Sequence, residues 1–256
     1  MGERPPYERF ANLSYEGFQE RALDPSLSAN ERSGFPDVLR AGKERRILED
    51  IASKLTPLER EGALVLDIGC GATPLTVSLM DRCKARLQTL FLVDSAEVLA
   101  LLPGEDSATN RIQRLAGRFP AIPALQDPSA PQFDAILVYS VLQYIFADEN
   151  LHGFFDQCLR LLAPGGRLLI GDLPNASMRS RFLLSEEGTL FHHGYTGSSD
   201  PPVIRWPDLP SGQLDDAVIF GLAMRARTAG YHAWILPQAG DLPMANRRED
   251  LLCQRP

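Results

Sequence analysis

The sequence predicts an α/β fold: a doubly wound, mostly parallel seven-stranded sheet with the last strand antiparallel and helices on both faces. Three observations support this fold class. Strand, turn and helix patterns alternate from residue 63 onward, the apolar runs are of strand length, and the last two runs flank a loop rich in Pro and Gly. The chain of 256 residues is long enough for one sizeable α/β domain with additions.

Short apolar runs mark the strands of this sheet. Phe133–Tyr139 is nearly continuously apolar, as expected of a parallel strand that is buried on both faces. Gly230 suits the left-handed cap of a helix expected over 211–229. The strands are expected at residues 63–68, 90–94, 111–117, 133–139, 167–171, 231–236 and 249–253.

Two segments depart from the alternation and divide the chain. Residues 1–60 are expected to form an N-terminal helical lid, in which Pro36 opens a helix that continues through an apolar stripe at 47–55. Residues 61–256 form the main domain, and its stretch 173–211 is rich in Pro, Ser, Gly and Asp. We expect this stretch to be an insertion that covers part of the ligand crevice.

The composition argues against several classes of partner. The net charge is −7 and only three lysines occur, whereas a nucleic-acid-binding surface needs an excess of basic residues. The longest apolar runs are too short to span a membrane, and the first residues lack a secretory signal. The four cysteines are widely spaced, which predicts neither a disulfide framework nor a zinc site. We therefore expect a cytoplasmic protein with reduced cysteines and a small-molecule partner; the sequence does not indicate its oligomeric state.

A glycine-containing turn follows the first strand, in the sequence Asp67-Ile68-Gly69-Cys70-Gly71-Ala72-Thr73-Pro74. Glycines suit a tight turn where a ligand approaches the backbone. Thr73 can cap the next helix, with Pro74 at its first position. A dinucleotide fingerprint would need Gly or Ala at Pro74, so a pyrophosphate site is disfavoured. The alternative to a ligand site is a purely structural turn.

This turn resembles motif I of class I S-adenosylmethionine-dependent methyltransferases, D-x-G-x-G-x-G, with Thr73 in place of the last glycine. The resemblance implies a Rossmann-like fold, S-adenosylmethionine as methyl donor and S-adenosylhomocysteine as product. It also implies that Asp67, Gly69 and Gly71, with Cys70 between the glycines, surround the methionine moiety of the donor.

Two further strand ends are assigned to the same cofactor. Asp94 ends the second strand, where a carboxylate can accept hydrogen bonds from both ribose hydroxyls, and Ser95 follows it. Gly117-Arg118-Phe119 stands where many family members have Gly-Asp beside the adenine. Backbone carbonyls could then read the adenine amine, with Arg118 or Phe119 against the ring. The alternatives are that Asp94 only caps a helix and that Phe119 is a core residue.

The later strands continue the resemblance. Residues 133–140 resemble motif IV, whose strand end flanks the transferring methyl, and this assigns Tyr139 and Ser140 to the cofactor site. Residues 161–166 resemble the helix end and turn that precede the fifth strand in the same family. Arg40, in the lid, is expected to meet the methionine carboxylate.

Methyl transfer is an in-line displacement, so the enzyme must hold donor and acceptor aligned in a dry site. A hydroxyl acceptor also needs a base. The candidate bases are Asp172, at the end of the fifth strand, and His192 and His193. The two histidines lie in the insertion 173–211, which is expected to cover the acceptor. Tyr144 could shape or hydrogen-bond the acceptor. The alternatives are that Asp172 anchors the next turn and that the histidines are surface residues. No metal-ligand pattern is visible, which predicts a metal-independent reaction.

The acceptor is inferred from a second resemblance. Residues 35–40 with Glu44, and residues 171–175, are similar to segments of bacterial methyltransferases associated with surface-polysaccharide or other glycan biosynthesis. This similarity implies O-methylation of a sugar or sugar-nucleotide hydroxyl. The alternatives are a phenol or carboxylate acceptor, or a catalytically silent protein that binds S-adenosylmethionine as a partner or sensor.

Overall fold

The structure, a computed structural model, describes residues 13–104, 111–204 and 213–256. Its centre is a seven-stranded sheet in the order β3-β2-β1-β4-β5-β7-β6, in which only β7 runs antiparallel to its neighbours. The predicted fold class is therefore confirmed. The strands are β1 (Leu64–Ile68), β2 (Thr89–Asp94), β3 (Ile112–Ala116), β4 (Phe133–Tyr139), β5 (Leu162–Pro174), β6 (His232–Pro237) and β7 (Arg248–Gln254).

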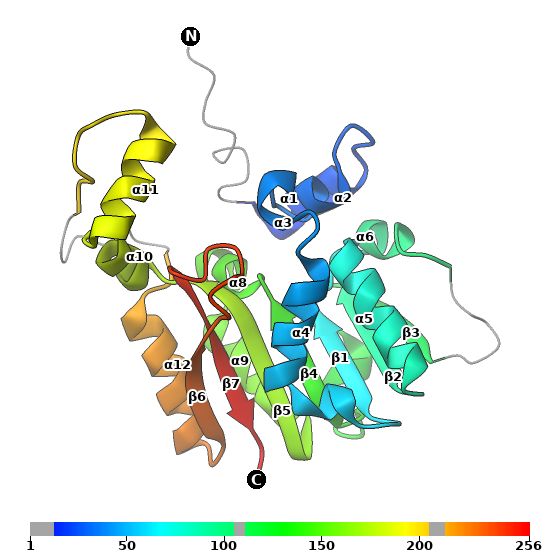
Figure 1. Ribbon diagram of the computed structural model, residues 1–256. Helices are drawn as coiled ribbons and strands as arrows, with labels where there is room; N and C mark the ends of the chain where they lie inside the picture. Colours follow the sequence, from blue (N-terminus) through cyan, green and yellow to red (C-terminus); the bar gives the residue numbers. More distant parts are fainter. Residues whose placement is uncertain (1–12, 105–110, 205–212) are drawn as a thin grey trace.

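The strand order reverses between β1 and β4. From β1 the chain winds outward through β2 and β3, and then returns to the other side of β1 with β4 and β5. Six of the seven strands, all but β7, run in the same direction, so their carboxyl ends reach the same edge, the upper one in Figure 1. In open α/β sheets ligands bind at such a reversal point, outside the carboxyl ends of the strands.

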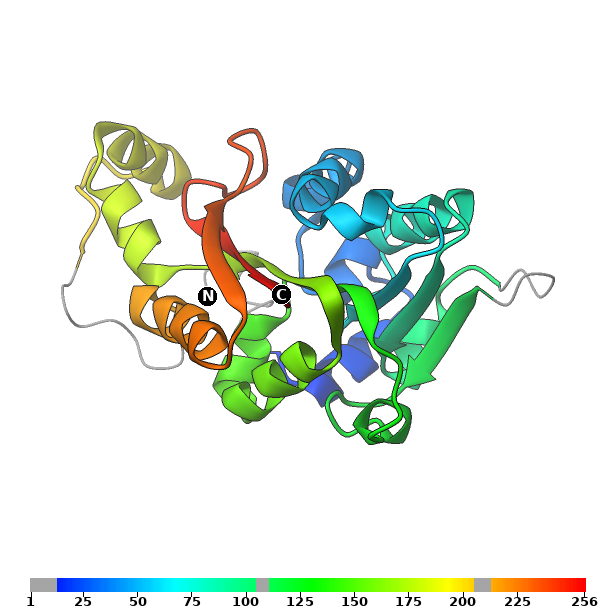
Figure 2. The same cartoon turned by 90° about the horizontal axis from the view of Figure 1, so that it is seen from below.

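Side chains of the central strands alternate between two cores because successive residues of a strand point to opposite faces. Val65 packs with α4, α5 and α6, whereas Leu66 packs with α7, α9 and α12. Figure 2 shows these helical layers on opposite sides of the sheet. The helices are α4 (Glu44–Lys54), α5 (Pro74–Ala85), α6 (Ala96–Ala100), α7 (Pro123–Gln126), α8 (Leu142–Asp148), α9 (Leu151–Arg160) and α12 (Asp216–Thr228).

The N-terminal segment forms three short helices above the carboxyl ends of the strands (Figure 1): α1 (Tyr15–Ala22), α2 (Ala29–Arg32) and α3 (Asp37–Arg40). The prediction of one continuous helix from Pro36 was wrong. Ala41 is extended and Gly42 has φ +77°, so the chain breaks its helical path before α4 begins at Glu44. This break turns the chain from the top of the molecule onto the face of the sheet.

The stretch 173–211 contains two helices that the composition did not indicate, α10 (Ala176–Leu183) and α11 (Glu186–Thr196). Each begins at a capping side chain, Asn175 and Ser185, that accepts a hydrogen bond from a backbone N–H of the first turn. The two helices lie beyond β7 and β6, away from α1–α3 (Figure 1). The next helix, α12, is capped by Asp215. Its predicted start at Ser211 lies outside the described residues, which resume at 213.

The fifth strand is longer than expected. β5 begins at Leu162 and runs through the Pro164-Gly165-Gly166 segment, which was expected to be a turn. The pairing is irregular there, and the register against β4 shifts between Phe133 and Ala135. Among the described residues, no helix combines the length and the hydropathy that crossing a membrane requires.

Candidate functional site

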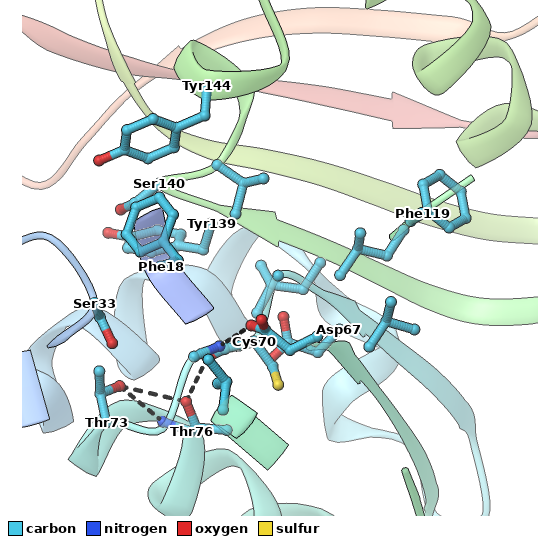
Figure 3. A pocket seen from close by; sticks show the side chains of 18 of the residues that line it. Phe18, Ser33, Asp67, Cys70, Thr73, Thr76, Phe119, Tyr139, Ser140 and Tyr144 are labelled. Atoms are coloured by element: carbon cyan, nitrogen blue, oxygen red, sulfur yellow. Dashed lines mark hydrogen bonds between the residues drawn. The ribbon is translucent and has the colours of Figure 1, made fainter. Parts of the chain in front are cut away.

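A cavity opens at the reversal point, between the carboxyl ends of β1, β2 and β4 and the helices α1–α3. It brings together every residue predicted for the cofactor except Ser95, and one of the four catalytic candidates, Tyr144. Figure 3 shows its walls. The lining side chains used below are Tyr15, Phe18, Arg32, Ser33, Phe35, Arg40, Asp67, Gly69, Cys70, Gly71, Thr73, Thr76, Asp94, Gly117, Arg118, Phe119, Tyr139, Ser140, Val141, Tyr144, Asp148 and Glu149.

The turn after β1 requires its glycines. Gly69 has φ +69°, and a Cβ at this position would lie 2.6 Å from Cγ2 of Val141. Gly71 has φ +62°, and its Cβ would lie 3.1 Å from Oγ of Ser33. Both a left-handed backbone and the lack of space therefore exclude larger residues at Gly69.

The first turn of α5 fixes the other side of this loop. The Thr73 side chain caps the helix, as predicted, with Pro74 at its first position. The Thr76 hydroxyl donates a hydrogen bond of 2.6 Å to the backbone oxygen of Cys70, which Figure 3 shows between the loop and the helix. The loop is thus held in one shape before any ligand arrives.

Two carboxylates face the glycine turn. Asp94 accepts hydrogen bonds from the backbone N–H of Gly71 at 2.9 Å and of Ser95 at 2.8 Å. Burial raises the pKa of Asp94, although these two bonds oppose the rise. Asp67 is 5% exposed, and among the described residues no donor is hydrogen-bonded to its carboxylate. Burial, followed by the charge of Asp94, raises the pKa of Asp67 to about 8.

Ser95 and Cys70 have structural positions in this region. The Ser95 hydroxyl accepts from the backbone N–H of Val98 and so caps α6; its side chain does not line the cavity, contrary to the prediction. Cys70 lines the cavity, and burial raises the pKa of its thiol well above the usual value. A protonated thiol is a small spacer rather than a nucleophile.

Arg118 and Phe119, which follow the end of β3, also line the cavity. Arg118 is ion-paired with Glu149 at 2.8 Å and Glu16 at 3.3 Å, so it joins α8 to α1. Phe119 is 4% exposed and packs edge-on against Phe154, with ring centroids 5.1 Å apart. Phe119 is therefore a core residue whose surface also reaches the cavity.

Arg40 crosses from α3 to the ends of β4 and β5. Its Nη2 donates to Ser140 Oγ at 2.6 Å and to Asp172 Oδ2 at 2.7 Å, and its guanidinium lies 3.9 Å over the Phe35 ring. Arg248 approaches the same carboxylate oxygen at 2.7 Å. One carboxylate therefore holds two arginines from opposite ends of the chain.

Asp172 is not placed to act as a base. It does not line the cavity, since Arg40 and Ser140 stand between its carboxylate and the open space. Burial would raise the pKa of Asp172, but Arg248 and Arg40 together hold it below the ordinary value. The carboxylate thus stays ionised and positions its neighbours.

The two predicted histidines are not brought to the cavity. His192 and His193 lie on α11, which packs against α10 rather than beneath α1–α3, and neither lines the cavity. Tyr144 does line it, and its ring packs edge-on against Phe18 at 4.9 Å. Burial raises the pKa of Tyr144, so its hydroxyl is a donor at neutral pH.

Several cavity residues carry no recognisable motif in the sequence. The N-terminal segment supplies Tyr15, Phe18, Arg32, Ser33 and Phe35 to the walls. The only local signals were the aromatic spacing over 15–18 and the capping pattern at the start of α2. Both signals indicate helices, but they do not show that these helices cover the site.

Comparisons with known proteins relate part of the chain to methyltransferases. The family model described as a methyltransferase domain matches residues 66–168. The chain is 33% identical over 181 residues to the chondramide synthase cmdD of Chondromyces crocatus, covering 66% of this chain and 4% of that protein. It is 33% identical over 127 residues to a ubiquinone biosynthesis O-methyltransferase of Xylella fastidiosa, covering 48% of this chain and 46% of that one. The chain thus spans less than half the length of either relative.

A solved structure supports the fold over nearly the whole chain. The plantazolicin methyltransferase BpumL in complex with S-adenosylhomocysteine aligns with a TM-score of 0.58 and 15% identity, covering 97% of each chain. At this identity the similarity concerns the fold alone. The fold is therefore that of class I methyltransferases, and residues 66–168 are similar to the methyltransferase-domain family.

Proposed function

We propose that the protein is an S-adenosylmethionine-dependent methyltransferase that acts on a small molecule. The observation that supports this most is the carboxylate of Asp67, which is buried at the glycine turn without a described hydrogen-bond donor. A buried carboxylate without a partner is unfavourable unless a ligand supplies a cation or a donor. The methionine portion of S-adenosylmethionine has an ammonium group, which is both a cation and a hydrogen-bond donor, and a sulfonium group, which is a second cation.

The remaining residues fit the same cofactor. Asp94, at the end of β2, can accept hydrogen bonds from two ribose hydroxyls while it keeps those from Gly71 and Ser95. A side chain at Gly69 would collide with Val141, which lines the same cavity, so glycine is required for the turn to keep this shape. The apolar surface of Phe119 and the backbone at Gly117 are assigned to the adenine.

The bound cofactor would supply an electrophilic methyl group on a positively charged sulfur. The task of the chain is to hold the acceptor in line with that group and to exclude water. The helices α1–α3, which close the cavity from above, are assigned this excluding role as a lid. The predicted acceptor-covering role of 173–211 is not supported by the cavity walls, because none of its described residues lines them.

The sequence-based prediction of a sugar hydroxyl acceptor stays a prediction. Names of the relatives point to other small molecules, including ubiquinone precursors and a plantazolicin, and these belong to those proteins. Among the described residues, no group of three His, Cys, Asp or Glu side chains could hold a metal ion, and a metal-independent reaction also stays a prediction.

The test is a transfer assay with methyl-labelled S-adenosylmethionine and panels of sugar nucleotides, phenols, carboxylic acids and amines. The proposal expects label in one class of acceptor and stoichiometric S-adenosylhomocysteine. Binding of the cofactor without transfer to any panel would instead support the sensor alternative. Absence of binding would contradict the proposed function itself.

A further inference from the structure

Arg40 presents unused hydrogen-bond donors to the cavity. An arginine has five N–H donors, and Nη2 of Arg40 uses its two on Ser140 and Asp172. No described residue accepts from its Nε or Nη1, although the side chain is only 10% exposed. A nine-tenths buried cation that faces an open cavity with free donors is arranged to receive an anionic ligand atom.

The charge of Arg40 is balanced from behind. The surrounding network contains three cationic and three anionic side chains, and only Arg40 among them lines the cavity. An anion placed beside Arg40 would therefore meet its positive charge first, with the three carboxylates of this network one layer further away. The six residues are Arg40, Lys54, Arg248, Asp50, Asp172 and Asp250.

Aromatic rings surround this cation. Phe35 lies 3.9 Å and Tyr139 5.4 Å from the Arg40 guanidinium, measured to the ring centroids. Phe18 and Tyr144 pack against each other in the same wall, on the side of the cavity opposite Asp67 and Phe119 in Figure 3. Flat apolar walls with a few donors favour an aromatic ligand over a sugar, which needs many polar partners.

The described cavity walls offer no base beside Arg40. They contain no histidine, and burial raises the pKa of both Tyr139 and Tyr144, which keeps these hydroxyls protonated. The carboxylates of the described walls lie elsewhere: Asp67 and Asp94 face the glycine turn, Glu149 is held by Arg118, and Asp148 is exposed. An aliphatic hydroxyl would therefore attack without a base. A phenol, with an ordinary pKa of about 10, loses its proton to solvent far more readily, and the charge of Arg40 favours the phenolate form.

We propose that Arg40 serves the acceptor in place of the methionine carboxylate predicted for it. The acceptor is a phenol bound as its phenolate, with the oxygen toward Arg40 and the ring among Phe18, Phe35 and Tyr144. The phenolate oxygen forms a bond to the methyl carbon as the carbon–sulfur bond breaks, and that bonding pair stays on sulfur. The products are a neutral aryl methyl ether and a neutral thioether, so no proton needs to be removed in this step. This inference rests on the proposed function, and it identifies the acceptor class for the same site.

The test uses 4-nitrophenol, whose ionised form absorbs visible light. It is titrated into the full-length protein with and without S-adenosylhomocysteine, and the pKa of the bound phenol is read from absorbance against pH. The expected result is a bound pKa lowered by at least half a unit, about a threefold preference for the phenolate. Arg40→Gln should abolish the shift, whereas Arg40→Lys should keep part of it because the charge remains.

The controls separate this inference from the proposed function. Arg45→Gln changes an arginine on α4 whose side chain is 93% exposed, and it should leave the bound pKa unchanged. A bound pKa that is unchanged or raised in the wild type, or the same shift in Arg40→Gln, would overturn the phenolate proposal. So would a base requirement, seen as a loss of tenfold or more in the transfer rate of Asp148→Asn. Calorimetry with S-adenosylhomocysteine alone decides the proposed function independently.

Discussion

The two ends of the cavity are built in different ways. The end proposed for the methyl donor is a contiguous loop, from Asp67 to Pro74, that one strand and one helix hold in place. The end proposed for the acceptor joins Arg40, Ser140 and Asp172. The hydrogen bond from Arg40 to Asp172 links residues that are 132 positions apart in the sequence. The donor end can therefore be recognised in a short segment, whereas the acceptor end exists only in the folded chain.

The two ends should also differ in how substitutions affect them. At the donor end a backbone conformation and a lack of space determine the residue, so the effect of a substitution is steric and local. At the acceptor end charges hold each other in a buried network, so removing one member leaves others without partners. The following predictions test this contrast, from the largest expected effect to the smallest.

Gly69→Val should abolish cofactor binding. The new side chain would begin 2.6 Å from Val141 on a backbone with φ +69°, and the loop could relieve this clash only by leaving its ligand-binding shape. We expect S-adenosylhomocysteine affinity to fall by at least about a thousandfold in calorimetry. Gly165→Val is the matched control, because Gly165 also has positive φ but open space around its Cβ. Wild-type affinity in Gly69→Val would contradict the steric account.

Asp172→Asn should destabilise the fold more than it affects the donor end. Removing one carboxylate leaves the guanidinium groups of Arg40 and Arg248 buried without a counter-charge, which costs about 3–5 kcal/mol in the free energy of unfolding. Because the pKa of Asp172 is lowered in the folded state, its contribution is present above the unfolded pKa and is lost as pH falls through the folded value.

Urea unfolding of the wild type and Asp172→Asn across acidic and neutral pH measures this contribution. The difference in unfolding free energy should be largest at neutral pH and shrink on acidification. Asp241→Asn, which removes a surface ion pair with Arg46, is the control and should cost much less because water screens exposed charges. Equal losses in the two variants would show that the buried network does not stabilise the fold.

Asp67→Asn should remove a proton-linked part of cofactor binding. In the free protein the pKa of Asp67 is about 8, so at pH 7 the carboxyl is mostly protonated and must lose its proton to pair with a cationic ligand. Affinity of the wild type should therefore rise with pH between 6 and 8, by up to tenfold per unit. Calorimetry in two buffers of different ionisation enthalpy should detect proton release at pH 7.

The variant should bind more weakly and release no proton. Its affinity should also change less with pH than that of the wild type over the same range. Proton release of equal size in Asp67→Asn would assign the titration to another group, and would remove Asp67 from the ammonium site.

The double substitution His192→Ala with His193→Ala should have the smallest effect. Both residues lie on α11 and neither lines the cavity, so the transfer rate and its pH profile should stay within about twofold of the wild type. A drop of tenfold or more would show that α11 moves over the acceptor and would restore the histidines as candidate bases.

Much of the fold could be predicted from the sequence because it is encoded locally. β4 has the predicted bounds Phe133–Tyr139, and Thr73 caps α5 as expected. The failures arose where capping signals stood within breaker-rich sequence, as at Asn175 and Ser185, and where a short break at Ala41 and Gly42 divided an apparently continuous helix.

The candidate site was predicted unevenly for the same reason. Asp67, Gly69 and Gly71 could be found because spacing along one loop determines their arrangement. Asp172 was correctly placed at the sheet edge, but its role depends on Arg40 and Arg248, which no local pattern connects to it. Phe18 illustrates the same limit, since only tertiary packing brings it against Tyr144.

The most direct test of the central claim is calorimetric titration of the wild-type protein with S-adenosylhomocysteine, followed by the same titration of Gly69→Val. The account predicts binding at one site per chain in the wild type, no detectable binding in the variant, and no competition by NAD, because Pro74 excludes the pyrophosphate fingerprint. Absence of binding to the folded wild-type protein, or equal binding by the variant, would contradict it.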